Sequence, residues 1–146
     1  MEHGLKTWGK LKDLLQEGRN VVYLAGPLRG DGTPRAIAQN QARMAGLARM
    51  VQGLLPQAVL VVPHANFQFL DESGVEGLEV RTQILRACEA LVSRCDVLLV
   101  APGKSEGVLR EMAAARRSGI PILHLSNAEE IASKILLSAK GGIPRS

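Results

Sequence analysis

An alanine-rich segment, Ser105-Glu106-Gly107-Val108-Leu109-Arg110-Glu111-Met112-Ala113-Ala114-Ala115, follows the apolar run Val97-Leu98-Leu99-Val100 and precedes Gly119-Ile120-Pro121-Ile122. The apolar run has the length of a strand, and the alanine-rich segment has helix propensity. Residues 105–107 are therefore predicted to form a turn from strand to helix. Such a turn presents free backbone N–H groups and a hydroxyl to a polar ligand.

Glu111 lies about one helical turn beyond Gly107 in this predicted helix. A carboxylate near a helix N-terminus is favoured in its ionised form, and an ionised carboxylate can serve as a nucleophile. The alternative is an ordinary first-turn acid beside Arg110. The segment alone leaves both interpretations open.

A second strand–loop–helix pattern occurs near the start of the chain. Residues 21–24 are apolar and lead into Gly26-Pro27-Leu28-Arg29-Gly30, and a helical pattern begins near Pro34. These glycines allow a ligand to approach the backbone closely, and Arg29 can hold a phosphate bidentately, although the glycines could instead only make a tight turn. In an open parallel sheet, this loop and the loop at Ser105 both leave the carboxyl ends of strands, where such folds bind ligands.

Strand and helix patterns alternate along the chain. Strands are predicted over 21–24, 58–62 and 120–125 and from Asp96 onward, with helices over 5–16, 34–54 and 79–92, after 107 and after 127. Asp96 has a structural role in this prediction, as an acid that accepts N–H groups at a strand start. We predict an α/β fold, a single-domain Rossmann-like or flavodoxin-like three-layer sandwich with a four- or five-stranded, mainly parallel sheet. The pattern does not give the strand order.

Three segments are expected: an amphipathic helix in residues 1–19, the α/β domain in 20–140, and a mobile tail in 141–146. Within the first, Trp8 is expected to be a packing anchor. Residues 65–77 look like a loop long enough to cover a site as a lid.

Composition limits the classes of function. The chain has 146 residues, a formal charge of +4 and a pI of about 9.4, which suits an anionic small molecule. Aromatic residues make up only 3% and the basic residues are scattered, which disfavours a dedicated nucleic-acid-binding protein. No apolar run reaches membrane-spanning length and no signal peptide is visible, so we expect a cytoplasmic protein with no membrane partner.

Neither the cysteines nor the histidines are spaced as metal ligands. Cys88 and Cys95 lie seven residues apart, which fits buried free thiols, and the three histidines are His3, His64 and His124. No Gly-Lys-Ser/Thr follows the glycine loop, so it is not a Walker loop. We therefore expect no metal and no cofactor.

Together these residues resemble the nucleoside 2-deoxyribosyltransferase-like superfamily, which includes the deoxynucleoside-monophosphate N-glycosidases and uncharacterised bacterial and phage members. The resemblance runs from about residue 21 to 125. It is carried by Tyr23-Leu24-Ala25-Gly26-Pro27 with Arg29-Gly30, by Pro63-His64 ahead of Phe69-Leu70-Asp71, by Cys95-Asp96, and by Ser105-x-Gly107-x-x-x-Glu111 with Ala114 and Gly119-Ile120-Pro121.

The resemblance implies cleavage or transfer of the N-glycosidic bond of a deoxynucleoside or its 5′-monophosphate, with Glu111 as nucleophile. It implies that Ser105, Gly107 and the backbone of residues 26–30 bind a 5′-phosphate or hydroxyl. It also implies a homo-oligomer, because C-terminal residues of the related transferases reach a neighbouring subunit's pocket.

Further ligand-binding residues are expected around this pocket. In related sequences a tyrosine at the position of Tyr23 lines it, an arginine at that of Arg81 faces it, and an asparagine at that of Asn40 contacts the loop after Gly26. His64, at the end of a strand, could bind a sugar hydroxyl or move a proton. The alternatives are a plain buried tyrosine, an exposed arginine, a solvated amide and a capping histidine.

One departure from the family affects the chemistry. The related enzymes use an Asp in the helix before the third strand to hold or protonate the departing base, and its counterpart falls near Cys88, in a helix without Asp. Glu89 should point about 100° around the helix from Cys88. General-acid assistance is typically worth about a hundredfold or more, so a non-catalytic nucleotide-binding or regulatory domain is the alternative function.

Overall fold

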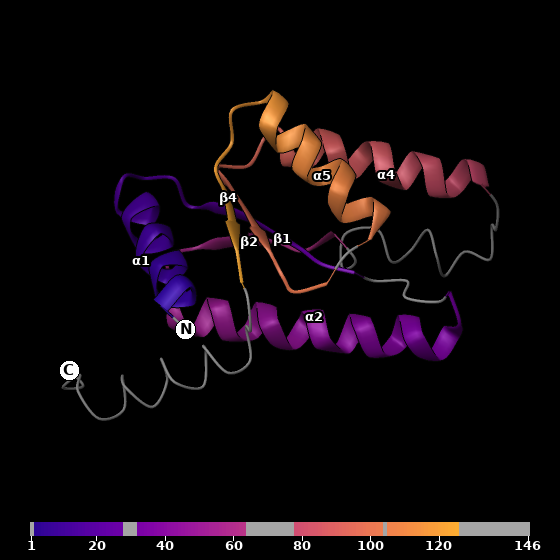
Figure 1. The fold of residues 1–146 in the computed structure, drawn as a ribbon, viewed down its shortest axis with the longest axis horizontal. Coiled ribbons are helices and arrows are strands. Elements are labelled where there is room, and N and C mark those ends of the chain that lie inside the picture. The colour runs from indigo at the N-terminus through magenta and orange to yellow at the C-terminus, as the bar shows by residue number, and fades with distance from the viewer. Residues whose placement is uncertain (1, 28–31, 64–77, 104, 126–146) are drawn as a thin grey trace.

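Four parallel strands form one sheet in the part of the chain that the structure describes. The structure is a computed structural model that describes residues 2–27, 32–63, 78–103 and 105–125 (Figure 1). The strands are hydrogen-bonded in the order β2-β1-β3-β4. Their bounds are β1 (Val21–Ala25), β2 (Val59–Val61), β3 (Val97–Val100) and β4 (Ile122–His124).

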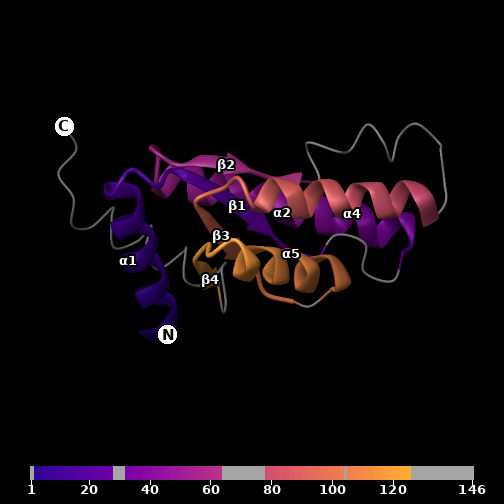
Figure 2. The same ribbon diagram turned by 90° about the horizontal axis from the view of Figure 1, so that it is seen from above.

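Helices cover both faces of this sheet. In Figure 1, α2 (Pro34–Leu54) lies below the sheet, and α4 (Leu78–Val92) and α5 (Glu106–Arg117) lie above it. Helix α1 (Glu2–Gln16) lies to the left of the strands and shares a core cluster with α2. Figure 2 gives the same arrangement seen from above. The predicted flavodoxin-like three-layer sandwich is confirmed, and its sheet has four parallel strands within the described ranges. The strand order places the topological switch point between β1 and β3.

Alternation along the central strand β1 divides the core between the two faces. Val22 and Leu24 face the cluster that contains α1 and α2, whereas Tyr23 and Ala25 face the cluster that contains α4 and α5. Both β1 and β3 are almost entirely buried, as their uninterrupted apolar sequences predict for central strands of a parallel sheet.

Local signals account for the helix boundaries. Thr33 caps α2 by accepting a hydrogen bond from the backbone N–H of Ala36 at 3.2 Å, and Pro34 occupies the first helical position. The chain leaves α1 through Gly18, whose φ of +88° favours glycine. Trp8 of α1 is buried with an exposed fraction of 6%, which confirms its prediction as a packing anchor.

Two expectations about strand ends were wrong. Strand β1, predicted over 21–24, continues to Ala25, because its pairing with β3 extends to Ala25 opposite Val100. The strand expected over 120–125 is shorter, because the backbone N–H of Ile120 bonds to the Ala115 carbonyl and so belongs to the turn that ends α5.

Asp96 has the structural role that was predicted. Its Oδ2 accepts a hydrogen bond from the backbone N–H of Val21 at 3.0 Å, and its own N–H donates to the Val21 carbonyl at 2.8 Å. This acid therefore joins the starts of β1 and β3. The predicted lid over 65–77, the helix after 127 and the tail over 141–146 lie outside the described residues.

None of the helices within the described ranges combines the length and the apolar character needed to cross a membrane.

Candidate functional site

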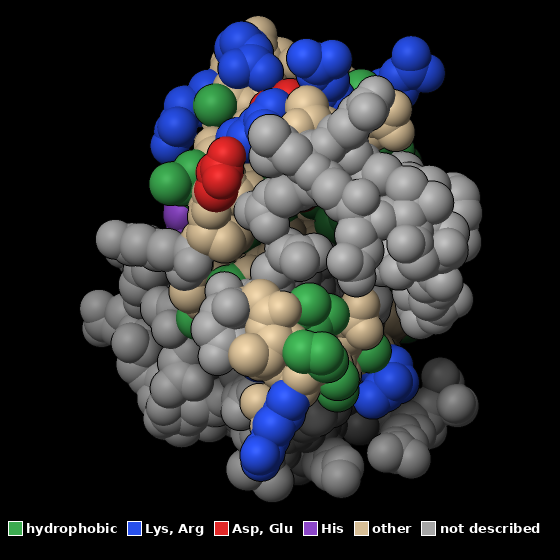
Figure 3. Space-filling view, turned by 90° about the vertical axis from the view of Figure 1, so that its right-hand side faces the viewer, with side chains coloured by type: hydrophobic (Ala, Val, Ile, Leu, Met, Phe, Trp, Pro, Cys, Tyr) green, Lys and Arg blue, Asp and Glu red, His purple; other side chains and the backbone are tan. Residues whose placement is uncertain are grey.

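The loops that follow β1 and β3 meet at the switch point of the sheet. A Cβ atom at Gly103 would lie 2.6 Å from Pro27 Cγ, and Gly103 has a φ of +113°, so the backbone of one loop packs directly on the other. Arg43 of α2 donates from Nη2 to the carbonyl of Pro102 at 2.6 Å. The start of α5 is thus held beside the end of β1. Figure 3 views the molecule from this side, and Lys and Arg side chains gather there over the α4–α5 layer.

A tyrosine–carboxylate pair lies beneath these loops, between the sheet and the α4–α5 layer. The Tyr23 hydroxyl donates a hydrogen bond to Glu111 Oε2. Tyr23 is fully buried, and Glu111 has an exposed fraction of only 7%. The two residues are 88 positions apart in the chain. They meet because Tyr23 projects from β1 toward α5, and Glu111 lies on the buried face of that helix.

Cys88 of α4 completes the group. The Tyr23 hydroxyl and the Glu111 carboxylate both lie close enough to its thiol to influence the pKa of Cys88. Cys88 is buried. Strand β1 and helices α4 and α5 each contribute one member to this Tyr23–Cys88–Glu111 cluster. According to the family resemblance, the related enzymes carry their second carboxylate near the position of Cys88.

Burial determines the charge of Glu111. It raises the pKa of the Glu111 carboxyl to about 7, against an opposing effect of the Tyr23 hydrogen bond, and the charge of Glu89 adds to the rise. The expectation that the helix N-terminus would favour the ionised form was therefore wrong. Glu111 lies five residues after Glu106, the first residue of α5, and the field of a helix terminus falls off within its first turn.

The other two members of the cluster hold their protons more firmly than usual. Burial raises the pKa of the Tyr23 phenol far above its ordinary value, and the nearby Glu111 charge adds to this. Burial likewise raises the pKa of the Cys88 thiol to about 11. Around neutral pH, Glu111 is therefore the member of the cluster that titrates.

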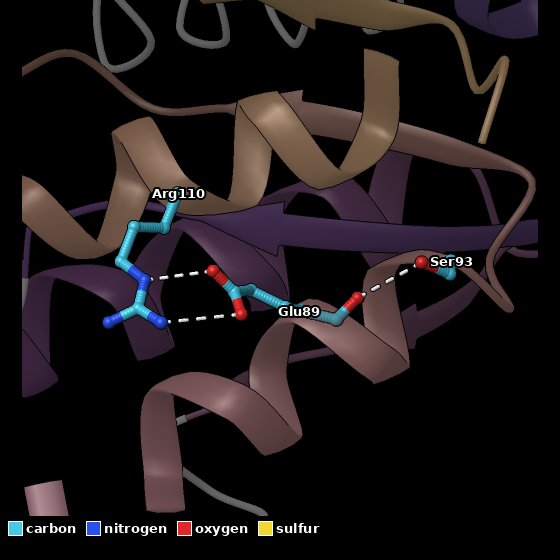
Figure 4. A network of polar contacts seen from close by, with 3 residues as sticks. All are labelled: Glu89, Ser93 and Arg110. Carbon is cyan, nitrogen blue, oxygen red and sulfur yellow. Dashed lines mark hydrogen bonds and ion pairs between the residues drawn. The ribbon is translucent and has the colours of Figure 1, made fainter. Parts of the chain in front are cut away.

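The remaining acid beside the cluster, Glu89, is bound on the outer side of the helix pair. Arg110 Nε donates to Glu89 Oε1 at 2.8 Å and Arg110 Nη2 to Oε2 at 3.4 Å, which joins α4 to α5 (Figure 4). The alternative interpretation of Glu111 as an ordinary first-turn acid beside Arg110 is therefore wrong. Glu111 points into the core, and the partner of Arg110 is Glu89.

The structure describes four of the predicted backbone-binding positions, Gly26, Pro27, Ser105 and Gly107. Ser105 is the N-cap of α5, and its hydroxyl accepts a hydrogen bond from the Val108 N–H at 3.2 Å. Gly107 lies inside the first turn of α5, where a Cβ atom would meet Leu85 at an ordinary 3.6 Å. A Cβ atom at Gly26 would lie 2.5 Å from Met44 Sδ, so packing against α2 favours glycine there, and a larger residue would require the end of the Met44 side chain to move.

The other predicted site residues lie mostly outside the described ranges. Leu28, Arg29, Gly30 and His64 lie outside the described residues, as does the side chain of Arg81, whose backbone is in α4. Asn40 lies on α2 and is half-buried. Among the described residues, no group of three His, Cys, Asp or Glu side chains could hold a metal ion.

Two contacts of the site were not anticipated from the sequence. Arg43 bonds to Pro102 across 59 positions of the chain, and Met44 fills the space beside Gly26. Both lie on α2 within one turn of Asn40, which was expected to contact the loop after Gly26. Because Arg43 lies within one helical turn of Asn40, the spacing along α2 could have indicated that Arg43 also contacts these loops.

No protein-family model matches this chain, and no curated protein matches its sequence.

Proposed function

We propose that this protein cleaves or transfers the N-glycosidic bond of a deoxynucleoside or deoxynucleoside 5′-monophosphate, with Glu111 as the nucleophile. The observation that supports this most directly is the hydrogen bond from Tyr23 to the buried Glu111 carboxylate, next to the switch point of the sheet. Open α/β sheets bind ligands at that point, and carboxylates with strongly shifted pKa values are common at functional sites. The family resemblance assigns the same two residues to the pocket.

The carboxylate suits the reaction because cleavage of the bond builds positive charge on the sugar. An ionised Glu111 would stabilise that charge and form a bond to C1′. Tyr23 holds Oε2, so Oε1 is the oxygen left to attack; in the described part of the chain, the hydrogen bond to this carboxylate comes from Tyr23. Water would then release the sugar in a hydrolase, and a second base would accept it in a transferase.

The phosphate would bind above the cluster, at the start of α5. Ser105 and Gly107 lie where the helix presents backbone N–H groups, and the loop after β1 adjoins them through the contact of Pro27 with Gly103. The resemblance adds Arg29 and the backbone of residues 26–30. A net charge of +4 suits an anionic substrate.

Replacing the nucleophile tests this proposal. Wild-type protein should release free base from members of a panel of deoxynucleoside monophosphates, and Glu111→Gln should lower the rate by about a hundredfold or more. Mass spectrometry of the wild-type protein should find a glycosyl adduct on Glu111. Glu89→Gln is the matched control, because it removes a carboxylate from the neighbouring helix that is bound to Arg110. Base release at the wild-type rate by Glu111→Gln would refute the assignment.

A non-catalytic nucleotide-binding domain is the second candidate, and the burial of Glu111 favours it. With a pKa of about 7 and an exposed fraction of 7%, this carboxyl group is partly protonated and shielded at neutral pH. Such a domain would bind deoxynucleotides, measured by calorimetry, and release base from none of them.

The proposal also includes a cytoplasmic homo-oligomer. Two buried free thiols, Cys88 and Cys95, suit a reducing compartment. The oligomer rests on the family resemblance, and light scattering of the purified protein would test it.

A further inference from the structure

Two consecutive residues of α2 reach the chain where it leaves both central strands. Arg43 Nη2 donates a hydrogen bond to the Pro102 carbonyl at 2.6 Å, and this bond joins segments that are 59 positions apart in the chain. Met44 lies against Gly26, where a Cβ atom would come within 2.5 Å of the Met44 Sδ and within 3.2 Å of Ala101 Cβ. Helix α2 therefore contacts the end of β1 and the residues directly after β3 at one place.

Three successive residues after β3 are each held by a different segment of the chain. The backbone N–H of Ala101 donates to the Ala25 carbonyl of β1 at 2.8 Å. The Pro102 carbonyl accepts its hydrogen bond from α2. Gly103 packs on Pro27 of the loop after β1, where a Cβ atom at Gly103 would lie 2.6 Å from Pro27 Cγ. The turn after β3 is thus held from three sides.

The bond from Arg43 selects one orientation of the peptide that joins Pro102 to Gly103. A Pro-Gly pair is typical of β-turns, and turns of types I and II differ in the direction of their central peptide. Gly103 has no side chain to exclude either direction, and its φ of +113° has the sign that a type II turn requires of the second central residue. A hydrogen bond from a cationic donor is about twice as strong as one between neutral groups, so the guanidinium is well suited to fix this carbonyl.

This turn leads directly into the candidate site. Ser105 is the N-cap of α5, and it accepts the N–H groups of Val108, at its hydroxyl, and of Leu109, at its carbonyl. Two residues of chain span at most about 7 Å, so a displacement of Gly103 also displaces this cap. Glu111 lies in the next turn of the same helix. The turn after β3 therefore sets where α5 begins relative to the sheet.

We propose that Arg43 is a positioning residue of this site, which holds the turn after β3 and thereby sets where Glu111 meets the substrate. This inference rests on the proposed function and adds a residue to it. Arg43 acts through Pro102 and α5, because α2 packs on the face of the sheet opposite to the cluster that contains α5. Placement matters for nucleophilic attack, since a displacement of about 1 Å can lower the rate about a hundredfold.

Arg43→Met tests this proposal, and Gln52→Met is its matched control. Methionine keeps an unbranched apolar stem at position 43 and removes the N–H donors. Gln52 also lies on α2 and donates to a backbone carbonyl, that of Ala58 at 2.8 Å, but Ala58 precedes β2 and so lies at the opposite edge of the sheet from the site. Both variants therefore lose a bond from α2 to the backbone, and only the first loses it at the turn before α5.

Steady-state kinetics provide the first readout, with the deoxynucleoside monophosphate that the wild type cleaves fastest. We expect kcat to fall about tenfold or more in Arg43→Met, with a smaller change in KM, and to stay within about twofold of wild type in Gln52→Met. A contact that serves stability alone would lower the free energy of unfolding in both variants without this difference in kcat.

Hydrogen exchange provides a second readout that needs no activity. The amides of Val108 and Leu109 are bonded to the cap of α5 and should exchange about tenfold or more faster in Arg43→Met than in the wild type. The Ile120 amide is bonded to the Ala115 carbonyl at the other end of α5 and should exchange as in the wild type. If circular dichroism shows Arg43→Met to be unfolded, Arg43→Gln, whose polar side chain is too short to keep the bond, is measured in its place.

The outcomes are distinct. A kcat that is unchanged in Arg43→Met, or that falls equally in Gln52→Met, overturns the positioning role and leaves the proposed function in place, as does unchanged exchange at the start of α5. A rise in KM with kcat unchanged would mean that Arg43 binds the substrate itself, and this too overturns the positioning role. Base release from no member of the panel by the wild-type protein overturns the proposed function and this inference with it.

Discussion

Tyr23 and Glu111 form the buried hydrogen-bonded pair on which the proposed function depends. The phenol stays protonated because burial raises its pKa, so it can only donate to the carboxylate. That hydrogen bond favours the ionised form of Glu111, whereas burial opposes it, and burial is the larger effect. The neighbours of the Glu111 carboxyl therefore bring its pKa close to neutral pH.

Removing the phenol hydroxyl should shift this titration. Tyr23→Phe deletes the hydrogen bond that lowers the pKa of Glu111, so that pKa should rise further above about 7. Activity that needs the ionised carboxylate should then appear only at higher pH. The measurement is the pH dependence of kcat/KM for base release, whose acidic limb should move upward by about one pH unit. An unmoved acidic limb would show that Tyr23 does not govern the charge of Glu111.

Helices α2 and α5 position the candidate site. Gly26 lies against α2 and Gly107 lies at the start of α5, and the space around these two glycines differs. Gly26 is enclosed by Met44 of α2 and by Ala101, whereas Gly107 at the start of α5 has room for a side chain. The first glycine is thus explained by packing. The second is not, and close approach of a ligand to the helix terminus is the reason we propose for it.

Alanine at these two glycines should have opposite effects on stability. Gly26→Ala should lower the free energy of unfolding by about 1 kcal/mol, since the end of the Met44 side chain must move. Gly107→Ala should raise it by about 0.5–1 kcal/mol through helix propensity, and should weaken dGMP binding about tenfold if phosphate contacts this turn. Urea denaturation and calorimetry measure the two effects.

Gly46→Ala in α2 is the control for Gly107→Ala. A Cβ atom there would meet nothing within 4 Å, so this substitution should stabilise by a similar amount. It should leave dGMP affinity unchanged. Equal affinity in Gly107→Ala and Gly46→Ala would remove Gly107 from the binding site.

At the scale of the whole molecule, one buried acid links folding to pH. The ordinary pKa of a Glu carboxyl is 4.5, and burial raises that of Glu111 to about 7. The folded protein therefore holds this proton more tightly than the unfolded chain does between these two values. The stabilisation that comes from protonating Glu111 is fully present below pH 4.5 and is lost as pH rises to about 7.

Glu111→Gln should remove this dependence. The free energy of unfolding of the wild type should fall relative to that of Glu111→Gln by up to about 3 kcal/mol between pH 4.5 and 7, and the difference should then stay constant. Denaturant titrations of both proteins across this range give the difference directly, because the other titrating groups cancel. A constant difference from pH 4 to 8 would show that Glu111 titrates normally.

Local sequence patterns were sufficient to predict most of the helices and strands. The bounds of α2 were predicted at both ends, because Pro34 at its start and apolar spacing along the helix are properties of the segment itself. The start of α5 was predicted to within two residues: the helix was expected after Gly107 and begins at Glu106, because the cap at Ser105 brings the next two residues into its first turn. The alternation of these elements was enough to predict a layered α/β fold.

Contacts between distant segments were decided only by tertiary structure. The order β2-β1-β3-β4, the bond from Arg43 to Pro102 and the meeting of Tyr23 with Glu111 depend on how the strands pair, and no local pattern records that pairing. The charge of Glu111 is the clearest case. A position near the start of a helix favours an ionised acid, and the sequence shows that position. The free energy of a charge also depends on how deeply it is buried, and burial is decided only when the layers pack.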